Sequence, residues 1–161
     1  MMTERRNPRS VDIDLLPTER VLKIINADDA VVANVVASAI PQIAKVVETA
    51  ADCIRGGGRI IYIGAGTSGR LAILDAVEIP PTFSTSPEWI QAVMAGGVKA
   101  FTQAIEGSED DRERAAADLK SKKLTKDDLV IGIAASGRTP YVIGALDEAR
   151  SIGTLTIAVP A

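Results

Sequence analysis

The residues best suited to chemistry in this chain are glycines and hydroxyl residues in two similar turns. The first turn is Gly64-Ala-Gly-Thr-Ser-Gly-Arg70 and the second is Ala134-Ala-Ser-Gly-Arg-Thr-Pro140. Each follows an apolar run and precedes a segment with helical spacing, and N–H groups at a helix N-terminus attract anions. Loops rich in hydroxyls and free of lysine suit a phosphate monoester. The expected phosphate contacts are Gly66, Thr67, Ser68, Ser136, Gly137 and Thr139.

The first turn also fits other interpretations. Its glycines match the G-x-G-x-x-G pattern of dinucleotide sites, which need an acidic residue at the end of the second strand. Glu88 has about the right spacing but stands before the second apolar segment, at the wrong end. A triphosphate loop is excluded because no G-x-x-x-x-G-K-[ST] sequence is present. A purely structural turn, with Ser68 as a helix cap, stays open.

Composition limits the chemistry further. The chain has 161 residues, a net charge of −3, no histidine and one cysteine, Cys53. A Ser-His-Asp or Cys-His site therefore cannot form within one chain, and a zinc ion has almost no soft ligands available. We expect no metal and no cofactor, and acid–base work falls to carboxylates. The basic residues form no stripe, which argues against nucleic-acid binding.

The N-terminal sequence gives no sign of targeting. It lacks the apolar segment of a signal peptide, and no apolar run approaches the roughly 20 residues of a membrane span. One cysteine allows no disulfide within the chain. The sequence therefore predicts a cytoplasmic protein without a membrane partner.

Hydrophobic periodicity predicts the elements that position the turns. Strands are expected at 59–63, 89–94, 129–133 and 155–159. Strands that alternate with helices indicate an α/β fold, with a parallel sheet of about four strands flanked by helices and preceded by N-terminal helices. Ligands of such sheets bind beyond the carboxyl ends of the strands, where both turns lie.

The helices are expected between these strands and before them. The pattern is helical over 21–54, with a break at Asn26 and Asp28-Asp29 and a second start at Pro41. Pro80-Pro81 should stop the helix that follows the first turn. Further helices are expected at about 68–77, at 99–105, from Ser108 onward with Asp111 in a capping box, and at about 139–151.

The two turns resemble those of the sugar isomerase (SIS) domain family, which binds phosphosugars. A wider set of motifs is similar to the N-acetylmuramic acid 6-phosphate etherase family, in order and over essentially the whole chain. The resemblance implies a flavodoxin-like SIS domain over 51–161, incomplete at its C-terminal end, after an N-terminal arm and helices over 1–50. The motifs begin at Thr3, Asp12, Ile24, Gly64, Glu78, Glu106 and Ala134.

The resemblance also implies that Glu78 and Glu109 are the catalytic acid–base pair. On the sequence alone both can be surface carboxylates, because Glu is mostly exposed in proteins. Glu109 also stands in an acidic first helical turn, where acids are stabilised without any catalytic role. Glu78 stands near the predicted end of its helix, where the dipole disfavours negative charge and suits a general acid. Glu106 is a nearby competitor for the role of Glu109.

The implied reaction is cleavage of the D-lactyl ether of N-acetylmuramic acid 6-phosphate to N-acetylglucosamine 6-phosphate and D-lactate. It proceeds by elimination and hydration in a homodimer, without a metal or redox cofactor. Three alternatives stay open at this point: a non-catalytic phosphosugar sensor on the same fold, an inactive fragment, and a dinucleotide-dependent oxidoreductase.

Overall fold

The structure is a computed structural model that describes residues 5–160. Thr3 and Glu4, at the start of one of the motifs named above, lie outside the described residues, as does Ala161. The chain forms two compact units, Met1–Glu48 and Thr49–Ala161.

The first unit consists mainly of one long helix. Two short 3-10 turns, η1 (Pro8–Ser10) and η2 (Ile13–Leu15), precede α1 (Thr18–Arg55), whose last residues belong to the second unit. Asp28 on α1 accepts a hydrogen bond from Asn7 and pairs with Arg9, which ties the first turn to the helix.

The predicted break and restart within α1 are wrong, because the helix runs without interruption through Asn26, Asp28 and Pro41. Asp28 uses its carboxylate on Asn7 and Arg9 and does not start a new helix. Pro41 removes one helical hydrogen bond, to the carbonyl of Ala37. Both residues are exposed, so water can bond to that carbonyl.

Helix α1 is also long and apolar enough to cross a membrane. Its most apolar 18-residue window has a mean hydropathy of 1.7, and none of that window is buried. The sequence-based statement about apolar runs therefore does not hold for this helix. Length and composition by themselves assign no membrane, since long helices of soluble proteins meet the same criterion.

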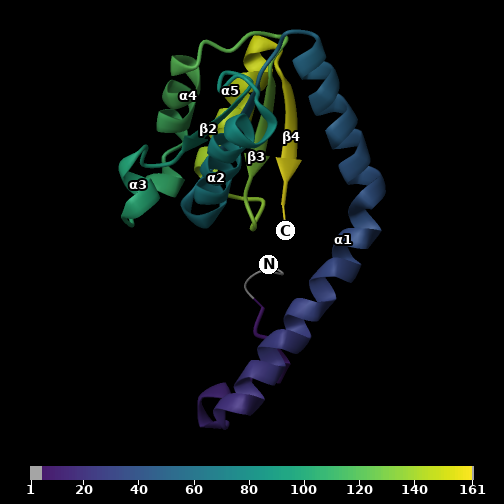
Figure 1. Cartoon of the computed structure of the whole chain (residues 1–161). Coiled ribbons are helices and arrows are strands. Elements are labelled where there is room, and N and C mark those ends of the chain that lie inside the picture. The colour runs from purple at the N-terminus through teal and green to yellow at the C-terminus, as the bar shows by residue number, and fades with distance from the viewer. Residues whose placement is uncertain (1–4, 161) are drawn as a thin grey trace. The chain divides into compact units, whose positions relative to one another are not determined.

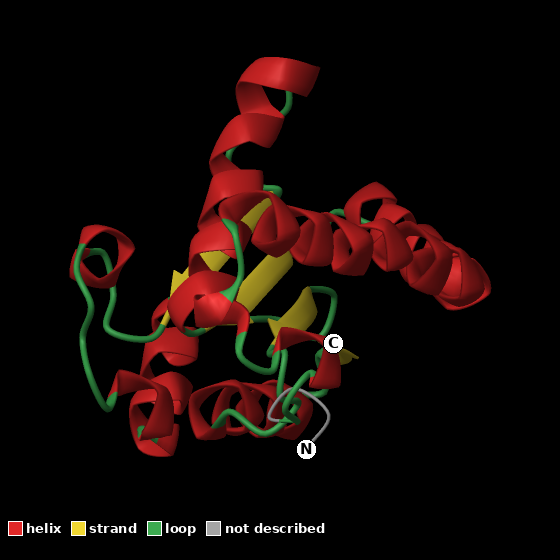
Figure 2. Ribbon diagram, turned by 90° about the horizontal axis from the view of Figure 1, so that it is seen from below, coloured by secondary structure: helices red, strands yellow, loops and turns green. Residues whose placement is uncertain are grey.

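The second unit is a parallel sheet with helices on both faces (Figures 1 and 2). Its strand order is β2-β1-β3-β4, so the chain changes direction across the sheet between β1 and β3. The bounds are β1 Ile60–Gly64, β2 Ile90–Met94, β3 Leu129–Ile133 and β4 Leu155–Val159, each within one residue of its prediction. The predicted α/β fold is confirmed.

The helices of this unit depart from the predicted bounds in several places. Helix α2 starts two residues early and continues through Pro80-Pro81, whose missing N–H groups leave only the carbonyls of Ala76 and Val77 without a helical partner. The segment from Ser108 is first a 3-10 turn. The bounds are α2 Gly66–Phe83, α3 Lys99–Thr102, η3 Ser108–Asp110, α4 Arg112–Ser121 and α5 Pro140–Ile152.

The role of Asp111 also differs from the prediction. It is the N-cap of α4, and its carboxylate accepts a hydrogen bond from the N–H of Arg114 at 2.8 Å. A cap at this position separates η3 from α4, so the predicted capping box that starts at Ser108 does not form. Within α4, Arg114 and Asp118, which are four residues apart, form an ion pair with 2.8 Å between Nε and Oδ1.

The core covers both faces of the sheet. On one face α4 and α5 pack against β1 and β3, and Tyr141 is fully buried there. Its hydroxyl donates to Asp118 at 2.8 Å, and burial together with this carboxylate raises the tyrosine pKa. The second face carries Ile60, Leu129 and Ile131, against which Cys53 packs.

A buried ion pair joins the residues that immediately precede the two central strands, Arg59 before β1 and Asp128 before β3. Asp128, only 3% exposed, accepts hydrogen bonds from Arg59 Nη2 at 2.7 Å, from Arg59 Nε at 3.0 Å and from its backbone N–H at 2.8 Å. The N–H of Thr125 donates to the same carboxylate at 2.9 Å. Burial acts to raise the pKa of Asp128, but the Arg59 guanidinium and these N–H groups outweigh it and lower the pKa.

Replacing Asp128 with Asn should lower the free energy of unfolding by about 3 kcal/mol at pH 7, because it leaves the Arg59 charge without its partner. A lowered folded pKa means that ionised Asp128 stabilises the fold above its unfolded pKa of about 3.9. This stability is lost as the pH falls through the folded pKa. The difference between the two proteins should therefore shrink below about pH 4 in urea titrations.

The exposed neighbour Asp127 gives the matched control. Asp127→Asn makes the same chemical change one residue away and should alter stability by less than about 0.5 kcal/mol. Equal effects of the two substitutions would contradict a special role for the buried pair.

Candidate functional site

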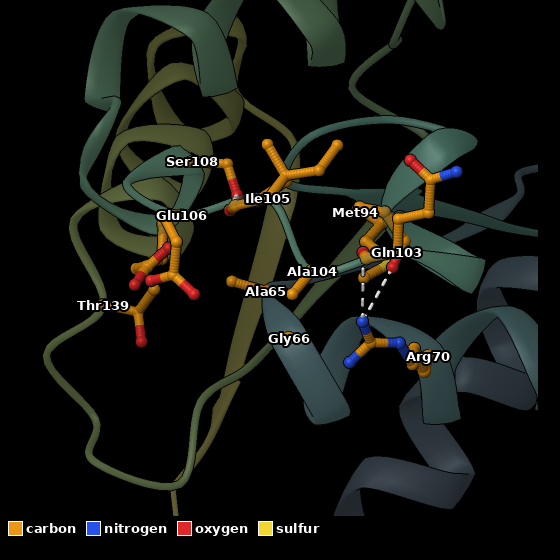
Figure 3. A pocket seen from close by; sticks show the side chains of 13 residues that line it. Ala65, Gly66, Arg70, Met94, Gln103, Ala104, Ile105, Glu106, Ser108 and Thr139 are labelled. Atoms are coloured by element: carbon orange, nitrogen blue, oxygen red, sulfur yellow. Dashed lines mark hydrogen bonds between the residues drawn. The ribbon is translucent and has the colours of Figure 1, made fainter.

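A cavity of about 310 Å³ lies at the carboxyl edge of the sheet, where β1 ends and α2 begins. Its volume suits a small ligand such as a monosaccharide phosphate. Figure 3 shows Arg70 on one side of the cavity, Glu106 and Thr139 on the other, and Gly66 between them. The walls are formed by Ala65, Gly66, Arg70, Met94, Ala95, Ala100, Gln103, Ala104, Ile105, Glu106, Ser108, Glu109 and Thr139.

The first turn places the N-terminus of α2 beside this cavity, and Gly66 lines it. The first helical hydrogen bond of α2 runs from the N–H of Gly69 to Ala65 at 3.2 Å, so the amides of residues 66–68 precede the regular hydrogen-bond pattern. Gly66 has a positive φ of 55°, which other L-residues adopt only at a cost. Ser68 lies inside α2 and Ala65 is its N-cap, so the interpretation of Ser68 as the cap is wrong.

Helix α2 sits unusually close to the end of β1. A Cβ atom built on Gly69 would lie 2.7 Å from Cγ of Met94 and 2.9 Å from the carbonyl oxygen of Gly64. No side chain fits between the strand and the helix at this point. The third glycine of the motif therefore brings the N-terminus of α2 against the sheet edge, independently of any nucleotide.

The predicted contact residues divide between two neighbouring cavities. Gly66 and Thr139 line the first, as does the predicted catalytic residue Glu109. Gly137 and Thr139 line a second cavity of about 220 Å³, mostly apolar, beside the end of β4. Thr139 therefore links the two. Thr67, Ser68 and Ser136 lie in the same turns but line neither cavity, and the Oγ of Ser136 accepts the N–H of Arg138 at 3.2 Å.

Glu78 lies away from the first cavity. It is exposed on α2, twelve residues after Gly66, which corresponds to roughly 18 Å along the helix axis at 1.5 Å per residue. Because α2 continues to Phe83, Glu78 is also more than one turn from the helix end, where the dipole effect is small. One copy of the chain therefore does not bring Glu78 to Glu109.

Glu106 and Glu109 both line the first cavity, and both are exposed. They belong to the segment between α3 and α4, in which Gly107 has a positive φ of 74°. The geometry does not choose between them as a base, so the preference for Glu109 continues to depend on the resemblance.

Arg70 lines the cavity although the sequence did not predict it there. Within the described residues it is the cationic side chain that lines the first cavity, and it donates to backbone carbonyls of residues 100, 101 and 103. Carbonyl partners leave no trace in residue types, so only its place after Ser68-Gly69 could have pointed to it. Arg138, at the same place in the second turn, is exposed.

A dinucleotide site is not supported by this geometry. Glu88 precedes β2 and so stands at the amino edge of the sheet, opposite the turn at Gly66. The acidic residue that would hold a ribose is needed at the carboxyl end of that strand.

The sequence profile of the glucokinase regulatory protein N-terminal SIS domain matches residues 42–150. The chain belongs to the SIS domain family. Solved structures agree with this fold. The structure of the chain is similar to that of phosphoheptose isomerase from Neisseria gonorrhoeae, with a TM-score of 0.66 and 20% identity, over 88% of this chain and 73% of that one. The phosphoheptose isomerase from Francisella tularensis has a TM-score of 0.62 and 15% identity, over 90% of this chain and 75% of that one.

Curated relatives of this SIS domain are named N-acetylmuramic acid 6-phosphate etherase. The protein from Clostridium beijerinckii is 52% identical over 159 residues, which cover 99% of this chain and 52% of the relative. The protein from Aeromonas hydrophila is 50% identical, over 99% and 53%. The chain thus spans about half the length of these relatives.

Replacing Gly69 with Ala should destabilise the SIS domain by about 2 kcal/mol, because the new methyl group overlaps Met94 and the Gly64 carbonyl. Gly66→Ala meets no neighbouring atom and carries only the left-handed backbone cost of about 1 kcal/mol. Chemical denaturation of both variants checks the order. A Gly69→Ala protein as stable as the parent would contradict the close packing of α2.

Proposed function

We propose that this SIS domain is the sugar-phosphate-binding part of an N-acetylmuramic acid 6-phosphate etherase. The observation that carries the proposal is that Gly66, Thr139 and Glu109 converge on one cavity at the switch point of the sheet. The names of relatives about 50% identical to the chain supply the substrate.

The 6-phosphate binds at the N-termini of α2 and α5. Their first amides have no helical partner, and the positive end of each helix dipole favours an anion. Gly66 and Thr139 line the first cavity and Gly137 lines its neighbour, while the hydroxyl residues Thr67, Ser68 and Ser136 stand in the same two turns. Holding the phosphate fixes the opened sugar chain against the carboxylates, which reduces the entropic cost of reaching the transition state.

The chemistry uses the acidity of the proton at C2, which is alpha to the aldehyde of the open-chain sugar. Glu109 removes this proton, and the electron pair of the broken C2–H bond forms the C2–C3 double bond. The C3–O bond breaks as Glu78 protonates the departing lactate oxygen. Water then adds at C3 and a proton returns to C2, which yields N-acetylglucosamine 6-phosphate and D-lactate. The two carboxylates act as general base and general acid.

We also propose that the two glutamates of one active site come from two copies of the chain. Glu78 stands roughly 18 Å along α2 from Gly66, a separation that a side chain cannot span. A two-fold symmetric dimer that places α2 of one copy over the cavity of the other would pair Glu78 with the partner's Glu109 twice.

The dimer offers an explanation for the exposed apolar side chains of α1. A second copy that covers them would remove a large apolar surface from water, as expected for a cytoplasmic protein. If α1 instead lay in a membrane, lipid would cover these side chains. The residues concerned include Val31, Val32, Val35, Val36, Ile40, Ile43 and Val47.

In a full-length protein that carries this chain, Glu109→Gln should reduce D-lactate release by about 100- to 10,000-fold, the usual effect of removing a general base. Exchange of the C2 proton with solvent, followed by NMR in D2O, should stop as well. Glu106→Gln is the matched control and should retain both. Retained C2 exchange in Glu109→Gln would refute the role of Glu109. Loss of exchange in Glu106→Gln alone would assign the role of base to Glu106.

Mixing two inactive variants tests the shared site. Glu78→Gln and Glu109→Gln subunits, unfolded together and refolded, should regain about a quarter of the parental D-lactate release, because half of the dimers are mixed and each has one intact site. No recovery would place both glutamates in one copy. A parental protein that binds the phosphosugar but releases no D-lactate would be a sensor.

A further inference from the structure

We propose that Arg70 is a positioning residue for Glu109. Its guanidinium holds the end of α3 and the start of the segment 103–109, which carries Glu109, against the helix whose N-terminus binds the phosphate. The role assigned to Glu109 rests on the proposed function, whereas the attachment of the segment rests on the hydrogen bonds of Arg70 alone.

The guanidinium of Arg70 bonds to three carbonyls around the end of α3. Nη2 donates to Ala100 at 2.9 Å and to Gln103 at 3.4 Å, drawn as dashed lines in Figure 3, and Nε donates to Phe101 at 3.1 Å. The last carbonyls of a helix have no helical partner, and an arginine can cap them. A planar guanidinium reaches several carbonyls at once, which a lysine ammonium cannot do with the same geometry.

Two further hydrogen bonds of the segment join residues within or next to it. The Oγ of Ser108 donates to the carbonyl of Ile105 at 2.8 Å, and the N–H of Asp110 donates to Gly107 at 3.2 Å. These bonds shape the segment, and its η3 turn, which carries Glu109, packs against α5. Arg70, one helical turn after Gly66, attaches the start of the segment to α2.

The second Ser-Gly-Arg turn shows that the sequence alone does not create this contact. Arg138 follows Ser136-Gly137 as Arg70 follows Ser68-Gly69, but its side chain is exposed and its backbone N–H bonds to Ser136. The contact of Arg70 with the carbonyls of residues 100, 101 and 103, which we call the clamp, thus depends on the end of α3 that lies beside the first turn.

This arrangement links phosphate and base through one rigid element. The amides of residues 66–68 fix the phosphate, and Arg70 on the same helix fixes the start of the segment that ends at Glu109. A displacement of about 1 Å between reacting groups can cost about 100-fold in rate. Arg70 would therefore affect proton removal without touching the reacting atoms.

The test compares Arg70→Lys with Arg55→Lys in the full-length protein. Arg55 lies at the other edge of the sheet in an exposed pair with Asp52, so its substitution gives the same change of side chain away from the site. Amide hydrogen exchange over 103–111 should become faster in Arg70→Lys and stay at the parental rate in Arg55→Lys. This measurement needs no substrate and no activity.

The kinetic readout separates positioning from general damage. In Arg70→Lys the rate of C2 proton exchange should fall by about 100-fold, while KM changes by less than about threefold because the phosphate contacts are intact. If Arg70→Lys does not fold, Arg70→Gln takes its place with the same expectations.

Each outcome decides a separate point. Parental hydrogen exchange over 103–111 in the variant would refute the clamp. Faster hydrogen exchange with parental C2 exchange would refute the positioning role. A parental protein that neither exchanges the C2 proton nor releases D-lactate would refute the proposed function, and the hydrogen-exchange comparison would still judge the clamp.

Discussion

The ion pair of Arg59 and Asp128 is the contact on which the site depends most. It joins the residues that immediately precede β1 and β3, and the N–H of Leu129 donates to the carbonyl of Arg59 at 2.8 Å in the same register. Because side chains alternate between the two faces of a sheet, a shift by one residue would turn both buried faces around. The pair thus fixes a register in which Gly64 lies opposite Ile133. Both turns then leave the sheet at the same level, which allows Gly66 and Thr139 to line one cavity.

The seat of α2 adds the second constraint. Gly64 and Gly69 let the helix approach the strand closely, so its N-terminus lies directly beyond the sheet edge, beside the cavity that Gly66 lines. Arg70 extends this fixed position to the segment after α3 through hydrogen bonds to its carbonyls. Three contacts thus follow one another from the amino edge of the sheet to its carboxyl edge. They are the Arg59–Asp128 pair, the close packing of α2 against β1, and the hydrogen bonds of Arg70 to the carbonyls near the end of α3.

The sequence predicted what local patterns control. Short apolar runs that end in glycine turns identified all four strands, and the alternation with helices identified the parallel sheet and its functional edge. It failed where a local rule was overridden: Pro41 and Pro80-Pro81 lie inside helices because the chain on both sides continues the helix. Arg70 was missed because its partners are backbone carbonyls, whose positions depend on tertiary structure. The choice of Glu109 rests on the resemblance, since a carboxylate near a helix start has the same sequence pattern whether it is catalytic or solvated.

The position of Glu78 follows from the same architecture. In a parallel α/β unit each helix runs back from the carboxyl edge, so residues three turns along it lie far from the ligand bound at its N-terminus. A carboxylate at that place serves the same pocket only if another copy of the helix lies across it. Glu109, by contrast, belongs to a segment attached beside the turn that begins α2. Under the proposed mechanism the base is therefore set by contacts within one chain and the acid by association of two. Loss of the dimer would then remove protonation of the lactate oxygen while leaving proton removal at C2 in place.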